Sequence, residues 1–246
     1  MKKGAILLSL PLCLSAGIAS ASILPELADC SWVAALSGGP IWSSNGETQT
    51  FYLTPTIEKT YVAAKKTKTL ATGELFLGLQ KPLPYQLQGQ FGLAFAATTN
   101  ARLNGIIWDD TEPQFDNHSY QYSVNARRIA VKGKLLADRN YFLTPWISGS
   151  VGVGLNRSHG YTNTPLIPEA LVNPNFSNHT KSSFSYSLGI GLQKNLNEHW
   201  QVGAGYEFVN WGKSELGRAY DQTLNTGLSQ NHFYTNGLMF NVTYIA

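Results

Sequence analysis

Two carboxylates and three bases stand in segments of the chain that are otherwise almost free of charge. They are Glu74, Arg127, Lys132, Lys134 and Glu207. A charge in a low-dielectric interior is costly unless an opposite charge and hydrogen bonds meet it. If these segments share one interior, we expect Glu207 to pair with Arg127 or Lys132, and Glu74 to pair with another of the bases. Such pairs form either a fixed ionic plug or a gate whose pairs exchange to admit ions.

Serine and histidine are adjacent at two places, which raises the question of nucleophilic catalysis. A serine hydrolase needs a serine and a histidine in reach of each other, with an orienting carboxylate or amide. The candidates are His118-Ser119, Ser158-His159 and the single His232. All of them lie in irregular connections, where histidines are more often solvated than catalytic. The five histidines also follow no metal-ligand spacing, so we expect no catalysis, no metal and no cofactor.

The elements that must position these charges are recognised by an alternation with a period of two, which is clearest in residues 85–97. The odd positions carry Tyr85, Leu87, Gly89, Phe91, Leu93 and Phe95. The even positions carry Gln86, Gln88, Gln90, Gly92 and Ala94. A period of two places the two sets on opposite faces of a strand. An apolar outer face and a small, polar inner face are typical of a transmembrane β-barrel.

Eight segments follow this pattern, and short connections between them alternate with long ones. The expected strands are 32–42, 72–80, 85–97, 120–136, 141–156, 183–193, 200–208 and 238–244. The expected turns are 81–84, 137–140 and 195–198, and the expected long loops are 43–71, 98–119, 157–181 and 212–236. The alternation slips by one residue at Arg127-Arg128, which predicts a β-bulge there.

The first long loop leaves two interpretations open. Residues 44–70 form either an extracellular hairpin or two extra strands. The hairpin is favoured because Lys59, Lys65 and Lys66 would make a poor lipid-facing surface.

The composition favours a membrane barrel over a soluble one. Charged residues make up 13% of the chain and aromatic residues 12%, at a mean hydropathy of -0.14. A soluble up-and-down barrel buries its apolar face inside, whereas the Gly, Ser and Gln face of these segments is too small and too polar for a core. The formal net charge is +3. With no stripe of lysine and arginine, we expect no nucleic-acid partner.

The amino terminus has the pattern of a secretory signal peptide. Lys2 and Lys3 precede an apolar run over residues 5–18, and Ala19-Ser20-Ala21 fits the small-x-small cleavage rule. We therefore expect residues 1–21 to be removed and residues 22–246 to form one barrel domain. Cys30 is then the one cysteine of the mature chain, so an intramolecular disulfide is excluded.

With this strand, turn and loop rhythm behind a signal peptide, the mature chain resembles the small outer-membrane barrels of Gram-negative bacteria, the OmpA-type and opacity-protein class. The resemblance implies an all-β, eight-stranded antiparallel up-and-down transmembrane β-barrel with four long extracellular loops. It implies a place in the bacterial outer membrane with both termini in the periplasm. It also implies contact with outer-membrane lipid and lipopolysaccharide, and with the barrel-assembly machinery.

Interfacial aromatic residues are expected at Trp200, Tyr206 and Tyr244, because tryptophan and tyrosine anchor such barrels at headgroup level. Asp109-Asp110 is similar to the paired acids of outer-membrane proteases, but those barrels have ten strands and a second acid and histidine pair that this sequence lacks.

Three functions follow from this architecture. The first is a non-enzymatic surface barrel that supports membrane integrity or binds a host or surface ligand through its loops, where binding normally resides. The second is a narrow, porin-like channel gated by the interior charges. A distant third is an outer-membrane lipid-modifying enzyme. A wide pore is excluded, because eight strands enclose a lumen that side chains fill.

Overall fold

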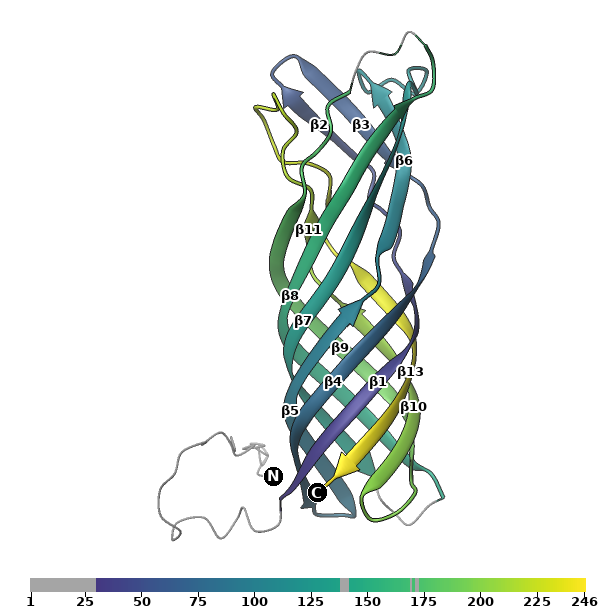
Figure 1. Ribbon diagram of the computed structural model, residues 1–246, viewed down its shortest axis with the longest axis vertical. Helices are drawn as coiled ribbons and strands as arrows, with labels where there is room; N and C mark the ends of the chain where they lie inside the picture. Colours follow the sequence, from purple (N-terminus) through teal and green to yellow (C-terminus); the bar gives the residue numbers. More distant parts are fainter. Residues whose placement is uncertain (1–29, 138–141, 169, 171–172) are drawn as a thin grey trace, which may run out of the picture.

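A computed structural model describes residues 30–137, 142–168, 170 and 173–246. Eight strands close into a ring in chain order, each antiparallel to its neighbours, and β7 pairs with β8 to complete the circle (Figure 1). The ring strands are β1 Ser31–Ser43, β4 Lys68–Leu83, β5 Leu87–Thr98, β7 His118–Ala137, β8 Thr144–Pro165, β9 His179–Asn195, β10 Trp200–Asn210 and β13 Tyr234–Ile245. The expected eight-stranded up-and-down barrel is confirmed.

Alternation along each ring strand separates an exposed apolar face from a buried, mostly small and polar one. On β9, Leu188 is 62% exposed while its neighbour Ser187 is 1% exposed. On β13, Phe240 is 57% exposed and Thr243 is fully buried. Apolar side chains on the outside of a closed sheet have no protein partner to cover them, and this is the arrangement that hydrocarbon stabilises. Among the described residues no helix is long and apolar enough to cross a membrane.

The first turn differs from the expected one. β4 continues through Lys81 and Pro82 to Leu83, and the chain reverses at Pro84, Tyr85 and Gln86 instead of at residues 81–84. Tyr85 and Gln86 have positive φ angles of 65° and 58°. The expected strand 85–97 therefore began two residues too early, because these two residues belong to the turn. The expected signal peptide and most of the expected turn 137–140 lie outside the described residues.

The long connections hold more strand than expected. β2 Gln49–Thr54 and β3 Ile57–Ala63 form the hairpin favoured for residues 44–70, and β3 pairs with β6 Ala101–Asp109. β6 was expected to be loop, yet it continues β5 and pairs with the first half of β7. Two short strands, β11 Ser214–Glu215 and β12 Ser229–Gln230, pair within the fourth connection. Strands β2, β3 and β6 extend the barrel at the end opposite to the carboxyl terminus (Figure 1).

The register shift on β7 lies between Gln121 and Ser123, where two steps on β7 match three steps on β8. The chain also gains a residue where β6 takes over from β5. Ala97 is opposite Arg127 and Ala101 is opposite Val124, so four steps along β5 and β6 match three along β7. The even-numbered residues of β7 stay buried from Tyr120 to Ala130 without a slip. The expectation of a bulge at Arg127-Arg128 was therefore wrong, because it assumed that Tyr120 and Tyr122 must face lipid.

A hydrophobic core fills the extended end of the barrel and accounts for this burial. Its large members are Ile41, Leu53, Tyr61, Leu70, Leu103, Ile107, Tyr120, Tyr122, Val124, Tyr161, Phe176, Trp211, Leu216, Leu228 and Phe233. Aromatic rings meet at close range inside it: the ring centroids of Tyr161 and Phe176 are 4.9 Å apart, and those of Tyr61 and Phe176 are 5.5 Å apart. At this end the inner face of the sheet is apolar, whereas nearer the carboxyl-terminal end of the barrel the inner face is mostly small and polar.

Candidate functional site: the lumen charge cluster

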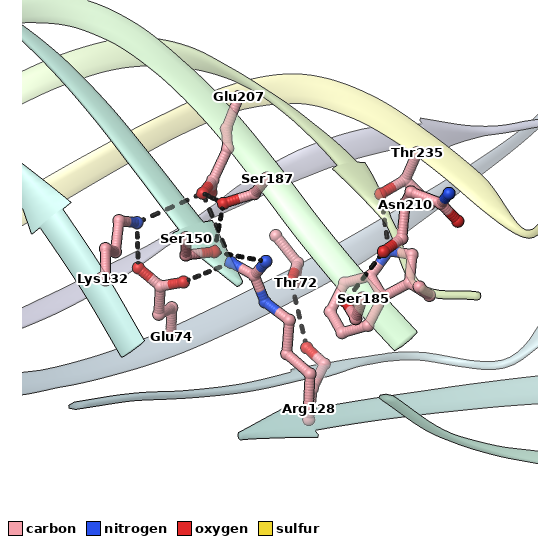
Figure 2. Close-up of polar contacts among 12 residues, drawn as sticks. Thr72, Glu74, Arg128, Lys132, Ser150, Ser185, Ser187, Glu207, Asn210 and Thr235 are labelled. Carbon is pink, nitrogen blue, oxygen red and sulfur yellow. Dashed lines mark hydrogen bonds and ion pairs between the residues drawn. The ribbon is translucent and has the colours of Figure 1, made fainter. Parts of the chain in front are cut away.

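Four charged side chains from three strands meet inside the barrel, and we name this set, Glu74, Arg128, Lys132 and Glu207, the charge cluster (Figure 2). The Arg128 guanidinium donates from Nη2 to Glu74 Oε2 at 2.7 Å and to Glu207 Oε1 at 3.3 Å. Lys132 Nζ donates to Glu207 Oε1 at 3.2 Å and also to Glu74. Each base therefore contacts both carboxylates, and the two charges of each sign balance.

Serine hydroxyls complete the charge cluster on the side of β8 and β9. Arg128 Nη1 donates to Ser150 Oγ at 3.1 Å, Ser150 and Ser187 share a hydrogen bond of 2.7 Å, and Ser187 donates to Glu207 Oε1 at 2.9 Å (Figure 2). The guanidinium carbon of Arg128 also lies 5.4 Å from the centre of the Trp211 ring. Charge-assisted hydrogen bonds are about twice as strong as neutral ones, so this network holds its members in one geometry.

The sequence placed three members of the charge cluster correctly in the lumen and one incorrectly. The structure brings Glu74, Lys132 and Glu207 together, and Glu207 meets Lys132. Arg127 is exposed on the outside of β7, and Arg128, with 2% exposure, takes the place expected for Arg127. The error follows from the misplaced bulge. Lys132, Ala130 and Arg128 are two residues apart and lie on one face of the strand. An uninterrupted period of two would therefore have predicted Arg128, and not Arg127, in the lumen.

Lys134 lies apart from the charge cluster, one step of two residues farther along β7. Its ammonium donates to Gln193 Oε1 and lies 4.7 Å from the centre of the Trp146 ring. Lys134 was expected in the lumen as one of three bases, and the structure gives it neither of the two carboxylates as a partner. Trp146, Ser150 and Ser187 were not expected as site residues, because their types do not distinguish them from other inward-facing positions.

The charge cluster separates two unlike halves of the lumen. On one side, Trp211 and Val209 begin the hydrophobic core, and this side is the extended end of the barrel. On the other side is a small, partly open cavity of about 40 Å³, lined by polar and small side chains together with Phe76, Trp146 and Met239. An ion that passed through the barrel would have to cross both the charge cluster and the hydrophobic core.

The aromatic residues expected at the interface lie on the outside of the barrel. Trp200 and Tyr244 are 45% and 39% exposed, and their ring centroids are 5.1 Å apart at the end that holds the carboxyl terminus. Tyr206 is also exposed and lies six residues farther along β10. Their role as headgroup anchors remains a prediction.

A second ionic group, which the sequence did not indicate, lies at the extended end. Glu215 contacts Lys181 Nζ at 2.9 Å, Lys213 Nζ at 3.1 Å and His179 Nε2 at 3.5 Å. Burial opposes the charged form of Glu215, but hydrogen bonds from Lys181 and Lys213 outweigh it and hold the pKa of this carboxyl below its ordinary value. The group ties β9 to the fourth connection.

No family model and no curated protein matches the sequence. Among solved structures, the chain is similar to the outer-membrane protease OmpT from Escherichia coli, with a TM-score of 0.51, 7% identity, and coverage of 92% of this chain and 99% of that chain. The chain has the fold of an outer-membrane β-barrel. It is also similar to Neisserial surface protein A, with a TM-score of 0.43, 11% identity, and coverage of 87% and 96%. OprG from Pseudomonas aeruginosa gives a TM-score of 0.39, 11% identity, and coverage of 87% and 95%.

Sequence identities this low establish a common fold and nothing about activity. The surroundings of the candidate catalytic residues in this outer-membrane barrel do not resemble those of a serine hydrolase. His118 and Ser158 are buried, whereas their neighbours Ser119 and His159 are partly exposed on the opposite faces of their strands. The His232 ring stacks on Tyr234, at 5.3 Å between centroids. These positions do not place a serine hydroxyl against an imidazole.

Asp109, the first residue of the acidic pair, has structural partners. Asp109 accepts hydrogen bonds from Lys59 at 2.6 Å and from Asn117 at 2.8 Å. Partial burial opposes its charged form, but these bonds outweigh it, and the pKa of Asp109 lies below its ordinary value. Such a carboxylate is a poor general base. Among the described residues no three of His, Cys, Asp and Glu gather as a metal site would require.

Proposed function

We propose that this chain is a non-enzymatic protein of the bacterial outer membrane that holds a closed, rigid platform above the membrane for contact with a surface ligand. The observation that carries the proposal is the hydrophobic core at the extended end of the barrel. Loops that serve only as connections do not need a core of their own. A core there gives the recognition surface a defined shape, and pre-organisation reduces the entropy lost on binding.

Hydrogen bonds between the fourth connection, residues 211–233, and the hairpin of β2 and β3 support a rigid platform. Leu53 O accepts from the backbone nitrogens of Thr223 and Leu224 at 3.0 and 3.1 Å. Asn225 Nδ2 donates to Tyr52 O at 2.9 Å. These bonds cover the free edge of β2, which would otherwise offer unpaired backbone groups to another chain.

The surface of this platform offers apolar side chains that its own core does not use. The exposed members are Tyr52, Ile57, Phe115, Leu166, Ile167, Tyr220 and Leu224. Exposed apolar groups that gather on one end of a soluble surface are typical of sites of contact with protein or lipid. They favour a host protein, a neighbouring cell surface or lipopolysaccharide as the ligand, with outer-membrane lipid around the lower barrel and the barrel-assembly machinery as a partner during insertion.

A narrow channel is the second candidate, and the charge cluster favours it. Arg128 already lies within hydrogen-bonding distance of both Glu74 and Glu207, so an exchange of partners needs little movement. The hydrophobic core opposes this function, because its packed side chains fill the path that an ion would take through the extended end. If the charge cluster is a gate, Glu207→Ala should raise single-channel conductance, whereas a plug loses stability and stays silent.

Adhesion of cells that display the barrel tests the proposed function. Escherichia coli expressing the chain should bind epithelial cells or immobilised lipopolysaccharide more than cells with an empty vector. The double variant Leu166→Ser with Ile167→Ser, and separately Tyr220→Ser, should reduce this binding at least about tenfold, since buried apolar anchors dominate interfaces. Lys66→Ser, at another exposed position, is the matched control. Equal binding by all variants, with equal surface amounts, would contradict the proposal.

A further inference from the structure

The lumen contains one base more than its carboxylates can match. The charge cluster pairs Arg128 and Lys132 with Glu74 and Glu207. Lys134 remains, and within the described chain no carboxylate lies within ion-pair distance of its ammonium. A lysine ammonium carries three donors. Gln193 accepts from one and the face of the Trp146 ring meets the amino group, so the contacts of Lys134 in the described chain include no anion.

Lys134 lines the cavity beside the charge cluster, and a second donor lines it as well. The indole nitrogen of Trp146 is buried without a hydrogen-bond acceptor, in a side chain that is 7% exposed. An indole N–H is a donor only. A buried donor without an acceptor costs about 1–3 kcal/mol, and an uncompensated buried charge costs more. Both costs fall if the cavity holds an anion.

The wall opposite Trp146 is shaped to hold the indole in place. A side chain on Gly191 or Gly205 would begin 2.5 Å from Trp146 Cζ2, and one on Gly189 would begin 3.3 Å from Cζ3. These three glycines let the indole lie flat on β9 and β10. The ring is therefore a fixed floor under the ammonium rather than a mobile side chain. Ser148, Gln90 and Asn241 add polar side chains to the same cavity.

We infer that this cavity, bounded by Lys134, Trp146 and the charge cluster, is a binding site for a small monovalent inorganic anion. The ammonium supplies the charge, and the indole N–H supplies a neutral donor. Arg128 and Lys132 each donate hydrogen bonds to both carboxylates of the charge cluster, and Ser187 donates to Glu207. These carboxylates therefore repel an anion less than free carboxylates would. The space suits an anion of one or a few atoms, and chloride is the simplest probe.

Chloride titration of the purified barrel in detergent micelles tests this site. Chloride is raised from about 1 to 100 mM at constant ionic strength, with gluconate as the replaced anion. Specific binding to the folded state should raise Tm by at least about 2 °C, and the ³⁵Cl NMR line should broaden. Lys134→Met should abolish both effects and should be at least as stable as the native barrel at low chloride, because it removes a partly buried lysine that has no carboxylate partner.

Lys194→Met is the matched control, since Lys194 also lies on an aromatic ring, 3.9 Å from the centre of Phe142, but is not among the residues that line the cavity. It should keep the full chloride response. If Lys134→Met does not fold, Lys134→Gln and Trp146→Phe replace it, and Trp146→Phe should weaken chloride binding several-fold. A native barrel that shows no chloride effect, or a Lys134→Met barrel that keeps it, would overturn the site.

Discussion

At the scale of single residues, neighbouring arginines show how completely one position along a strand decides the role of a side chain. Arg127 faces outward and is exposed, whereas Arg128 is buried and contacts two carboxylates and a serine. The chemistry of the two side chains is the same. Their surroundings differ because consecutive residues of a strand point to opposite faces.

Arg128→Met should therefore destabilise the barrel by about 3–5 kcal/mol, since it leaves two carboxylates with one base in a buried site. Arg127→Met is the control on the opposite face and should change stability by less than about 0.5 kcal/mol. Urea titration of the folded barrel in micelles, followed by the gel shift between folded and unfolded forms, measures both. Similar midpoints for the two variants would show that the charge cluster does not stabilise the fold.

The group around Glu215 leads to a pH-dependent prediction. Because the pKa of Glu215 is lower in the folded state, its contribution to stability is complete above the unfolded value of about 4.3 and is lost as the pH falls through the folded value. The Tm difference between the native barrel and Glu215→Gln should shrink below about pH 4, where the carboxylate becomes protonated. Exposed Glu112→Gln should show no such difference. A difference that grows further below about pH 4 would contradict the assignment.

At the scale of elements, glycines on the inner face of β9 and β10 decide what the lumen can hold. Gly191 and Gly205 pair across the two strands, and the Trp146 indole occupies the space that side chains there would fill. One large ring therefore replaces several small contacts. The indole therefore explains why the inner face of these strands carries glycines while their outer face carries large apolar side chains.

Gly205→Ala should destabilise the barrel by roughly 1–3 kcal/mol, because the new methyl group would meet both Trp146 and Ile190 O at less than 3 Å. Gly149→Ala on β8 is the matched control, since its nearest neighbour would be 3.7 Å away. Thermal unfolding of both variants in the same detergent provides the comparison. If Gly205→Ala also fills the place of the indole, fluorescence of Trp146 should shift to the red.

The limits of prediction from sequence are clearest at this scale. Outward alternation on β8, β9, β10 and β13 was predicted correctly, because below the hydrophobic core most of their inner side chains are small or polar, with Trp146 and Met239 as exceptions. It misled on β7, where Tyr120 and Tyr122 fill a hydrophobic core above the charge cluster. A period of two distinguishes two faces but does not say which face is inside. That choice depends on the partners across the lumen, such as Phe176 and Trp211, which are distant in sequence.

At the scale of the whole molecule, the barrel combines an apolar outer surface with a lumen divided by charge. The start of β1, the end of β13 and the turn between β4 and β5 lie at one end of the barrel, and β2, β3 and β6 lie at the opposite end (Figure 1). The side of the membrane that each end faces remains a prediction. The rule that short turns are periplasmic and long loops are extracellular favours the extended end outside.

Epitope tags test this orientation. Asn163 lies within β8, so a tag there would interrupt the strand. A tag inserted after Ile167, just beyond the end of β8, tests the same end of the barrel without this damage. This tag should bind antibody on intact cells, whereas a tag after Asn197, in the turn before β10, should bind only after permeabilisation. Antibody access to the Asn197 tag alone on intact cells would reverse the orientation.

The central claim is that the hydrophobic core and the charge cluster together close the barrel, so that it serves as a platform and not as a pore. Planar lipid bilayer recording of the purified native barrel tests this claim most directly. The account predicts no discrete current steps in 1 M KCl at either polarity, with Glu207→Ala equally silent although less stable. Regular single-channel steps from the native barrel, increased by Glu207→Ala, would contradict the account and establish the charge cluster as a gate.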